Sequence, residues 1–215
     1  MRNFKRFIIG PFRLAPIVFL FANTVAWAQS VSGNVPFTPT PIGITSPPGQ
    51  ALTTTEQQAI VAALLANKTV SAQAAGHKVR AVRIKHGFVT TSPNRSKQGE
   101  YRATVVMFDY TDGTAIEYGM DPDTGALVSQ AQLRGRPQAS AEEIEIAAKV
   151  VRQDPTLRKL LLTAAPLAGG FVVDAPAGQP PSHRYVQMKI FRLDLARTLR
   201  TVVVDLTDET VALSS

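Results

Sequence analysis

Apolar positions along this chain change their spacing from a helical period to a strand period, and the same change occurs twice. From Thr53 they recur every three or four positions, and Thr53 with Glu56 three residues later has the sequence of a capping box. After Gly76 they alternate with polar positions, which is typical of strands with one solvated face. The first half therefore predicts one helix followed by about four antiparallel strands. The expected turns lie at Asp112-Gly113 and Pro122–Gly125.

The second half repeats this order. Ser140 and Glu143 form another capping-box sequence, and Asp154 before Pro155 predicts the start of a further helix. The segments "GGFVVDA", "HRYVQMKIFRLDL", "RTLRTVVVDLT" and "TVALS" then predict strands. At an offset of 84 positions, three residues coincide: Tyr101 with Tyr185, Thr114 with Thr198, and Asp121 with Asp205. We therefore expect an α+β protein of two tandem units, each a helix packed on a four-stranded antiparallel sheet.

The first expected strand is unusually basic. Val82, Ile84 and Phe88 alternate with Arg83 and Lys85, so the two cations share one face. One interpretation is a solvated face that discourages edge pairing; the other is a docking strip for an acidic partner or an anionic surface. No aromatic residues are interleaved for base stacking, so a nucleic-acid partner is not expected. The possible docking strip consists of Lys78, Arg80, Arg83, Lys85, Arg95 and Lys97.

The N-terminal residues have the pattern of a secretory signal. A basic start is followed by the apolar run "LAPIVFLFANTV" and by "AWA", which predicts a signal peptide over residues 1–28 with cleavage before Gln29. A membrane anchor is the alternative, but the apolar stretch is short of the ~20 residues that span a bilayer. We expect a periplasmic or secreted protein without a stable membrane anchor after cleavage.

Cleavage would change the charge balance. The whole chain has 23 Lys+Arg, 16 Asp+Glu and a net charge of +7. Loss of Arg2, Lys5, Arg6 and Arg13 leaves 19 cations against 16 acids, or about +3. The high overall charge therefore gives little support for nucleic-acid binding. The chain has no cysteine, which excludes disulfides, thiol catalysis and thiolate metal sites.

Proline content separates the leader from the folded part. Residues 29–50 contain five prolines and no charge, which favours an extended tether. The expected folded domains are residues 51–135 and 136–215.

Few side chains suggest chemistry. His77, His86 and His183 do not form a ligand pattern, and solvent-facing or edge positions are the simpler interpretation. Ser129 and Ser182 lack the sequence context of an activated nucleophile. The turn aspartates fit local hydrogen bonding. We expect no catalytic residue, no metal and no cofactor.

Some segments resemble a known family. "ASAEEIEIAAKVVRQDPTLRKLL" and "VVVDLTDETVALS" resemble the start and end of the N3 domain of copper-containing amine oxidases. "DYTDGTAIEYGMDPDTGALVSQ" is similar to the closing hairpins of the N2 domain of that family. The resemblance implies two cystatin-like accessory domains, an N2-like and an N3-like one.

The catalytic motifs of that family are missing. Its quinone cofactor forms from a Tyr within Asn-Tyr-Asp/Glu, and two of its copper-binding histidines form a His-x-His pair; this sequence has neither pattern. The resemblance thus implies a free-standing pair of accessory domains or a truncated gene product. The leading hypothesis is an exported, non-catalytic binding or accessory protein whose partner is another exported protein.

Two alternatives stay open. A cystatin-like protein can inhibit a peptidase by wedging loops into its cleft, and the candidate loops are Pro122–Gly125 and Ala175–Ser182. The other alternative is a split amine oxidase that works with a separate catalytic chain. The partner would then be a peptidase or an amine-oxidase catalytic chain, respectively.

Overall fold

The structure, a computed structural model, describes residues 40–89, 99–163, 167–192 and 197–215. The predicted signal peptide and the first part of the predicted tether lie outside the described residues. The first half comprises α1 (Thr54–Ala66), α2 (Lys68–Ala74), β1 (Val79–Phe88), β2 (Tyr101–Asp109), β3 (Thr114–Met120) and β4 (Leu127–Gln132). The second comprises α3 (Ala141–Gln153), α4 (Arg158–Thr163), β5 (Leu167–Val173), β6 (Tyr185–Arg192), β7 (Arg197–Asp205) and β8 (Thr210–Ser214).

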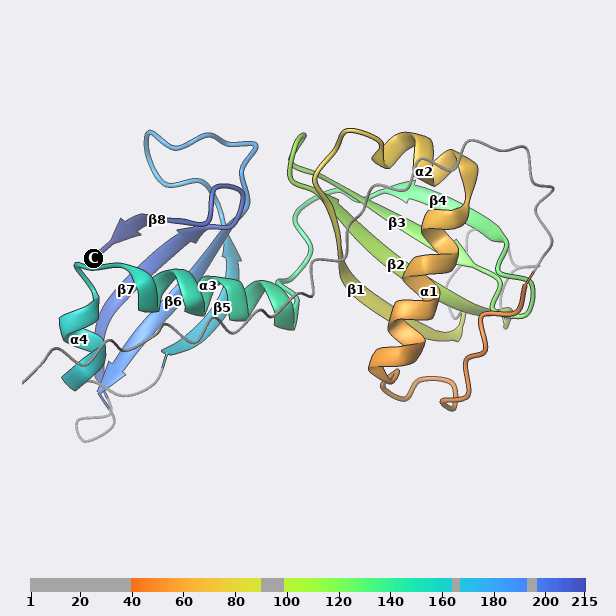
Figure 1. The fold of residues 1–215 in the computed structure, drawn as a ribbon, viewed down its shortest axis with the longest axis horizontal. Coiled ribbons are helices and arrows are strands. Elements are labelled where there is room, and N and C mark those ends of the chain that lie inside the picture. Colours follow the sequence, from red (N-terminus) through yellow and green to blue (C-terminus); the bar gives the residue numbers. More distant parts are fainter. Residues whose placement is uncertain (1–39, 90–98, 164–166, 193–196) are drawn as a thin grey trace, which may run out of the picture. The chain divides into compact units, whose positions relative to one another are not determined.

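Each half contains one antiparallel sheet, with strand orders β1-β2-β3-β4 and β5-β6-β7-β8 (Figure 1). Every strand therefore pairs with its neighbour in sequence. Helix α1 lies across the first sheet and α3 lies across the second (Figure 1). This confirms the predicted α+β class with two four-stranded antiparallel sheets. None of the described helices is long and apolar enough to cross a membrane.

Both predicted capping boxes are present. The Thr53 side chain accepts a hydrogen bond from Glu56 N, while the Glu56 carboxylate accepts one from Thr53 N. Ser140 and Glu143 make the same reciprocal pair at the start of α3. These contacts pair donors that a helix N-terminus leaves free, so the sequence pattern located both helix starts correctly.

Two helix predictions need correction. The first helix ends at Ala66 because Asn67 leaves the helical conformation; its side-chain oxygen accepts from the backbone of α2, a helix that the pattern did not predict. The helix expected from Asp154 begins only at Arg158. Asp154 caps the turn at 155–157 that leads into this helix, as an N-cap residue would, by accepting hydrogen bonds from Thr156 N and Leu157 N.

In the first sheet, strand β2 is buried on both faces. Ala103, Val105 and Met107 of β2 pack in one apolar cluster with Ile60 and Leu64 of α1. Val106 and Phe108 of β2 belong to a second cluster, which also contains side chains of α3, β6 and β7. The expected solvated face is therefore wrong for β2, whereas Arg83 and Lys85 of β1 and most of β4 are exposed.

The predicted alternation along β1 also fails at one point. A bulge between Ala81 and Arg83 leaves Val82 unpaired. Val82 joins the second cluster, whereas Ile84 packs against the first, and Phe88 is 58% exposed. The alternation predicted one shared face for these three apolar residues, and this prediction is wrong.

The last part of the Pro-rich segment is attached to the first half. Ile42 is buried, and its N–H donates to the carbonyl of Pro122. Thr45 and Ser46 both donate to the Glu56 carboxylate. These contacts extend the folded part of the chain to residues before the predicted domain start at 51.

Candidate functional site

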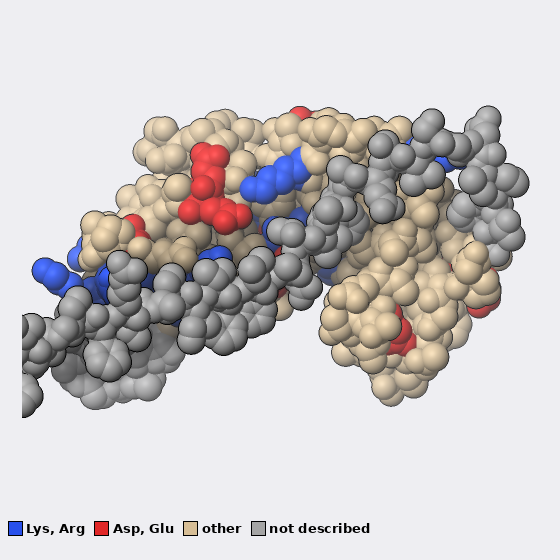
Figure 2. All heavy atoms as spheres, in the orientation of Figure 1, with Lys and Arg blue, Asp and Glu red and all other residues tan. Residues whose placement is uncertain are grey.

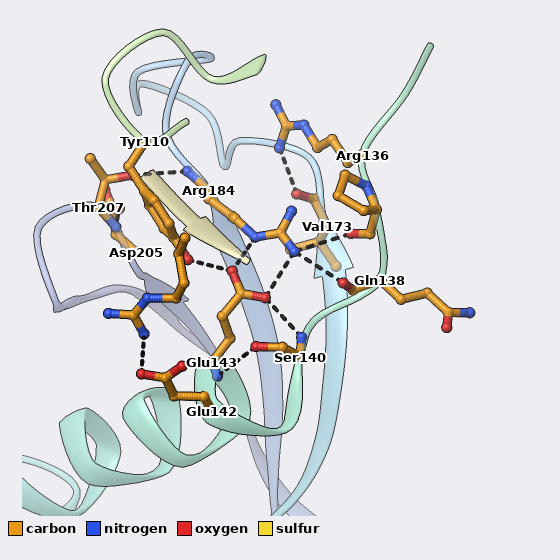
Figure 3. A network of polar contacts seen from close by, with 12 residues as sticks. Tyr110, Arg136, Gln138, Ser140, Glu142, Glu143, Val173, Arg184, Asp205 and Thr207 are labelled. Atoms are coloured by element: carbon orange, nitrogen blue, oxygen red, sulfur yellow. Dashed lines mark hydrogen bonds and ion pairs between the residues drawn. The ribbon is translucent and has the colours of Figure 1, made fainter. Parts of the chain in front are cut away.

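The most enclosed polar group of the described residues joins the two halves of the sequence. The Glu143 carboxylate and the Arg184 guanidinium form an ion pair in which neither side chain is exposed to solvent. Glu143 comes from the first turn of α3, and Arg184 directly precedes β6. The Tyr110 hydroxyl, which follows β2, donates to the same carboxylate, as Figure 3 shows.

The Arg184 side chain is held from several sides. Its Nη2 donates to Glu143 Oε2 at 3.0 Å and to the carbonyls of Pro137 and Gln138 at 3.1 Å each (Figure 3). The guanidinium carbon lies 4.4 Å from the centre of the Phe108 ring, which is within cation–π range. Only Nη1 lacks a hydrogen-bond partner among the described residues. The geometry fixes the arginine and leaves little room for a substrate.

Opposing effects act on the pKa values of this group. Burial alone would raise the pKa of Glu143, but the hydrogen bonds and charge of Arg184, with help from Tyr110 and Ser140 N, bring it below its usual value. Burial and the neighbouring Glu143 carboxylate raise the pKa of Tyr110 well above its usual 10. Glu143 is thus held ionised and Tyr110 protonated, the opposite of a carboxyl group prepared to act as a general acid.

A second polar arrangement occurs twice. His77 Nδ1 lies 2.6 Å from Asp109 Oδ2, and His183 Nδ1 lies 2.7 Å from Asp205 Oδ2. In each case a second aspartate follows three residues after the first. Its Oδ2 lies 3.6 Å from the histidine Nδ1 in Asp112 and 3.7 Å from it in Asp208. We call these two groups the His clamps.

The backbone around the two His clamps matches as well. Lys78 N and Arg184 N, each one residue after the histidine, donate to the hydroxyls of Thr111 and Thr207. The carbonyls of the same two residues accept from the residue after the first aspartate. Each His clamp therefore fastens the start of one strand to the turn that ends its neighbour.

The His clamps are the described groups that come nearest to a metal site. Each brings three ligand atoms within 4.8 Å of one another. However, the Oδ1 atoms of Asp109 and Asp205 already accept two backbone hydrogen bonds each, and their Oδ2 atoms contact the histidines. A histidine–aspartate hydrogen bond accounts for both geometries, so the chemistry of the donors favours a structural role.

His86 lies on an edge strand, as one of the two interpretations has it, but it does not face solvent. It is 5% exposed. Its Nδ1 contacts the Tyr101 hydroxyl, and its Nε2 lies 3.0 Å from the carbonyl of Gln50. His86 therefore ties the end of the Pro-rich segment to the first sheet.

The predicted docking strip is largely engaged within the chain. Lys78 Nζ donates to the carbonyl of Thr207, Arg80 lies 3.3 Å from Glu142, and Arg83 lies 3.2 Å from Glu117. Lys85 is exposed. Arg95 and Lys97 lie outside the described residues. On the face in Figure 2, cations and acids form small separate groups on a mostly uncharged surface.

The two candidate inhibitory loops differ in accessibility. Pro122 and Gly125 are buried, and the segment containing Thr40 and Ile42 covers them. Ala175–Ser182 has an exposed tip at Ala177 and Gly178, while its base is fixed by Arg136, which donates to the carbonyl of Pro181. The first loop exposes Asp123 alone, whereas the second loop offers the larger free surface.

Neither the Glu143–Arg184 pair nor the His clamps are predicted from the sequence. A signal for the clamps is present: "HK" with "DYTDGT" and "HR" with "DLTDET" share four of the six turn positions at an offset of 96. An alignment at an offset of 84 does not show this match. The first aspartate of each clamp ends the second strand of the first sheet but the third strand of the second sheet. Comparison of the sequence with known protein families and with curated proteins gives no match.

Proposed function

We propose that this chain is an exported, non-catalytic protein-binding module made of two cystatin-like units. The observation that carries the proposal is that the buried ionisable side chains of the described residues make structural contacts. The buried polar side chains of the described residues are Glu56, His86, Glu143, Arg184 and Asp205, and each is engaged in contacts that hold the fold.

Catalysis needs a polar group that is positioned yet still available to a substrate. Glu56 has both carboxylate oxygens occupied by Thr45, Ser46 and Thr53. Glu143 is enclosed by Arg184, Tyr110 and Ser140. These occupied groups support a binding role over a catalytic one.

The architecture supports the assignment to cystatin-like units. Each half has a helix that starts at a capping box and a four-stranded antiparallel sheet of neighbouring strands. The sequence resemblance to the N2 and N3 accessory domains of copper amine oxidases has the same order of elements. One fold can serve many functions, so the non-catalytic role is argued from the occupied buried side chains and the binding role from the accessible surface. Export rests on the signal-like residues 1–28.

The most accessible binding element is the loop Ala175–Ser182. Its tip is exposed and its base is held by Arg136 and by Tyr185, whose hydroxyl donates to the carbonyl of Pro180. A loop presented on a rigid base loses little entropy on binding. The same feature favours the second candidate function, inhibition of an exported peptidase.

The test compares two tagged baits in an extract of exported proteins. One is the natural chain, and the other has residues 176–179 replaced by Gly-Ser of equal length. We expect a protein that the natural bait retains and the variant loses. A peptidase among the retained proteins selects inhibition, and an amine-oxidase catalytic chain selects an accessory subunit. Amine-dependent peroxide release by the purified chain would contradict the proposal.

A further inference from the structure

One edge of the second sheet has neither a charge nor a proline to oppose pairing, and a bulge between Gly169 and Phe171 is the protection against pairing that it retains. Strand β5 is an edge strand, and its sequence "LAGGFVV" has no charged residue and no proline. Natural proteins usually block such edges with charges or prolines, as β1 does with Arg80, Arg83 and Lys85. Ala168 and Gly169 of β5 are exposed, so the edge is open to solvent.

A hollow of about 690 Å³ lies between this edge and α3. Leu167, Gly169 and Met188 form its apolar floor, and Ile144 and Ala148 line it from the helix. Four charged residues of α3 also line it: Glu142, Glu145, Lys149 and Arg152. Because they are three or four positions apart, they form one stripe along the helix.

Three of these charges lack a partner among the described residues. Glu145, Lys149 and Arg152 are exposed and make no ion pair there, even though Glu145 and Lys149 have the spacing of an intrahelical pair. Glu142 is 64% exposed and meets Arg80. Acids before bases along a helix also suit its dipole, so the stripe alone does not require a partner.

The positions of the four charges indicate what the partner is. In two antiparallel helices related by a two-fold axis at residue 147, position 145 faces 149 of the other copy, and 142 faces 152. Both acids would then face bases, with a single axis satisfying both pairs. Such self-complementarity is the property of an interface between identical chains.

We propose that two copies of this chain associate through the β5 edge and the charged stripe of α3. Pairing of β5 with β5 of the second copy would join the two sheets across the axis and cover both hollows. The bulge between Gly169 and Phe171 shortens the strand pairing, so the helix stripe carries much of the specificity. This inference is independent of the proposed function.

The experiment measures mass by sedimentation equilibrium on the chain purified after export, from about 1 to 100 µM. We expect a reversible dimer. Glu145→Lys and Lys149→Glu each place like charges opposite one another twice per dimer, so each raises the dissociation constant at least about tenfold. Asp123→Lys, which changes the net charge as Glu145→Lys does but lies in the β3–β4 turn, leaves it unchanged.

The most decisive measurement is made on a mixture of the two interface variants. Glu145→Lys has lysine at positions 145 and 149, and Lys149→Glu has glutamate at both. Each lysine would then face a glutamate of the other chain, so we expect the mixture to form a heterodimer. An intrahelical role for these charges predicts no effect of mixing. A natural chain that stays monomeric at 100 µM, or variants that fail to recover on mixing, would overturn the proposal; circular dichroism confirms that each variant is folded.

Discussion

Glu143 and Arg184 stand 41 positions apart in the sequence, yet they form an ion pair that is fully shielded from solvent. The tyrosine hydroxyl that completes the group comes from the first half of the chain. Phe108, also from that half, stacks on the guanidinium. One polar group therefore connects α3, β6 and the end of β2.

Removal of one partner of this pair should be costly. Glu143→Gln leaves the Arg184 charge buried without a counter-ion, and we expect a loss of about 3–5 kcal/mol in the free energy of unfolding. A double variant, Glu143→Gln with Arg184→Met, should recover a large part of that loss because it buries no charge. Urea unfolding of the single and double variants measures both. A single-variant loss below about 1 kcal/mol would show that the pair is not enclosed as described.

The Tyr110 hydroxyl should make stability depend on alkaline pH. At neutral pH, Tyr110→Phe removes a hydrogen bond to a buried carboxylate and should cost about 1–3 kcal/mol. Burial raises the pKa of Tyr110 in the folded chain, so its contribution is complete below pH 10 and is lost as pH rises above 10. The natural chain should therefore lose its advantage over the variant between pH 10 and 12. A constant difference across that range would contradict the assignment.

Acid should also destabilise the fold. Hydrogen bonds from Ser46 and Thr53 lower the pKa of Glu56 far below 4.5. Its contribution is therefore present above pH 4.5 and is lost as pH falls further. We expect the melting temperature of the natural chain to fall more steeply below pH 4.5 than that of Glu56→Gln, which is less stable at pH 7. If the melting temperatures of the two proteins fell in parallel with pH, the stabilising role of the Glu56 carboxylate would be contradicted.

The last hairpin contains a correctable strain. Asp109 and Asp205 start turns of the same kind, and the fifth turn residue is Gly113 in one and Glu209 in the other, with φ of 70° and 54°. Glu209→Gly should stabilise the chain by up to about 1 kcal/mol, since a left-handed conformation suits glycine better. Gly113→Ala should destabilise it, because an added Cβ would lie 2.3 Å from the carbonyl oxygen of Ser182. Thermal unfolding of both variants shows whether the melting temperature rises or falls. A change in the same direction for both variants would refute the comparison.

The His clamps should act as structural hydrogen bonds. His183→Ala should cost about 1 kcal/mol or more and His77→Ala less, because Asp205 is 4% exposed and Asp109 15%. Copper or zinc ions at equimolar concentration should not raise the melting temperature. A metal-dependent rise that disappears in both variants would instead identify the clamps as metal sites.

Local sequence signals predicted the elements well because capping boxes and turn aspartates act within a few residues. Thr53 with Glu56 and Ser140 with Glu143 are such cases, and both were confirmed. The bulge at Val82 could not be predicted, because it depends on how β1 pairs with β2. The Glu143–Arg184–Tyr110 group was missed for the same reason: no local pattern records which distant residues meet. Glu143 was correctly placed as a cap, but its second role depends on tertiary contacts.

We propose that this chain binds another exported protein and does no chemistry of its own. The most direct test is quantitative capture from an extract of exported proteins, with the tagged chain beside an unrelated bait of equal size and charge. We expect at least one protein that only this chain enriches and that an excess of the untagged chain displaces. Equal recovery of every protein on both baits would contradict the claim.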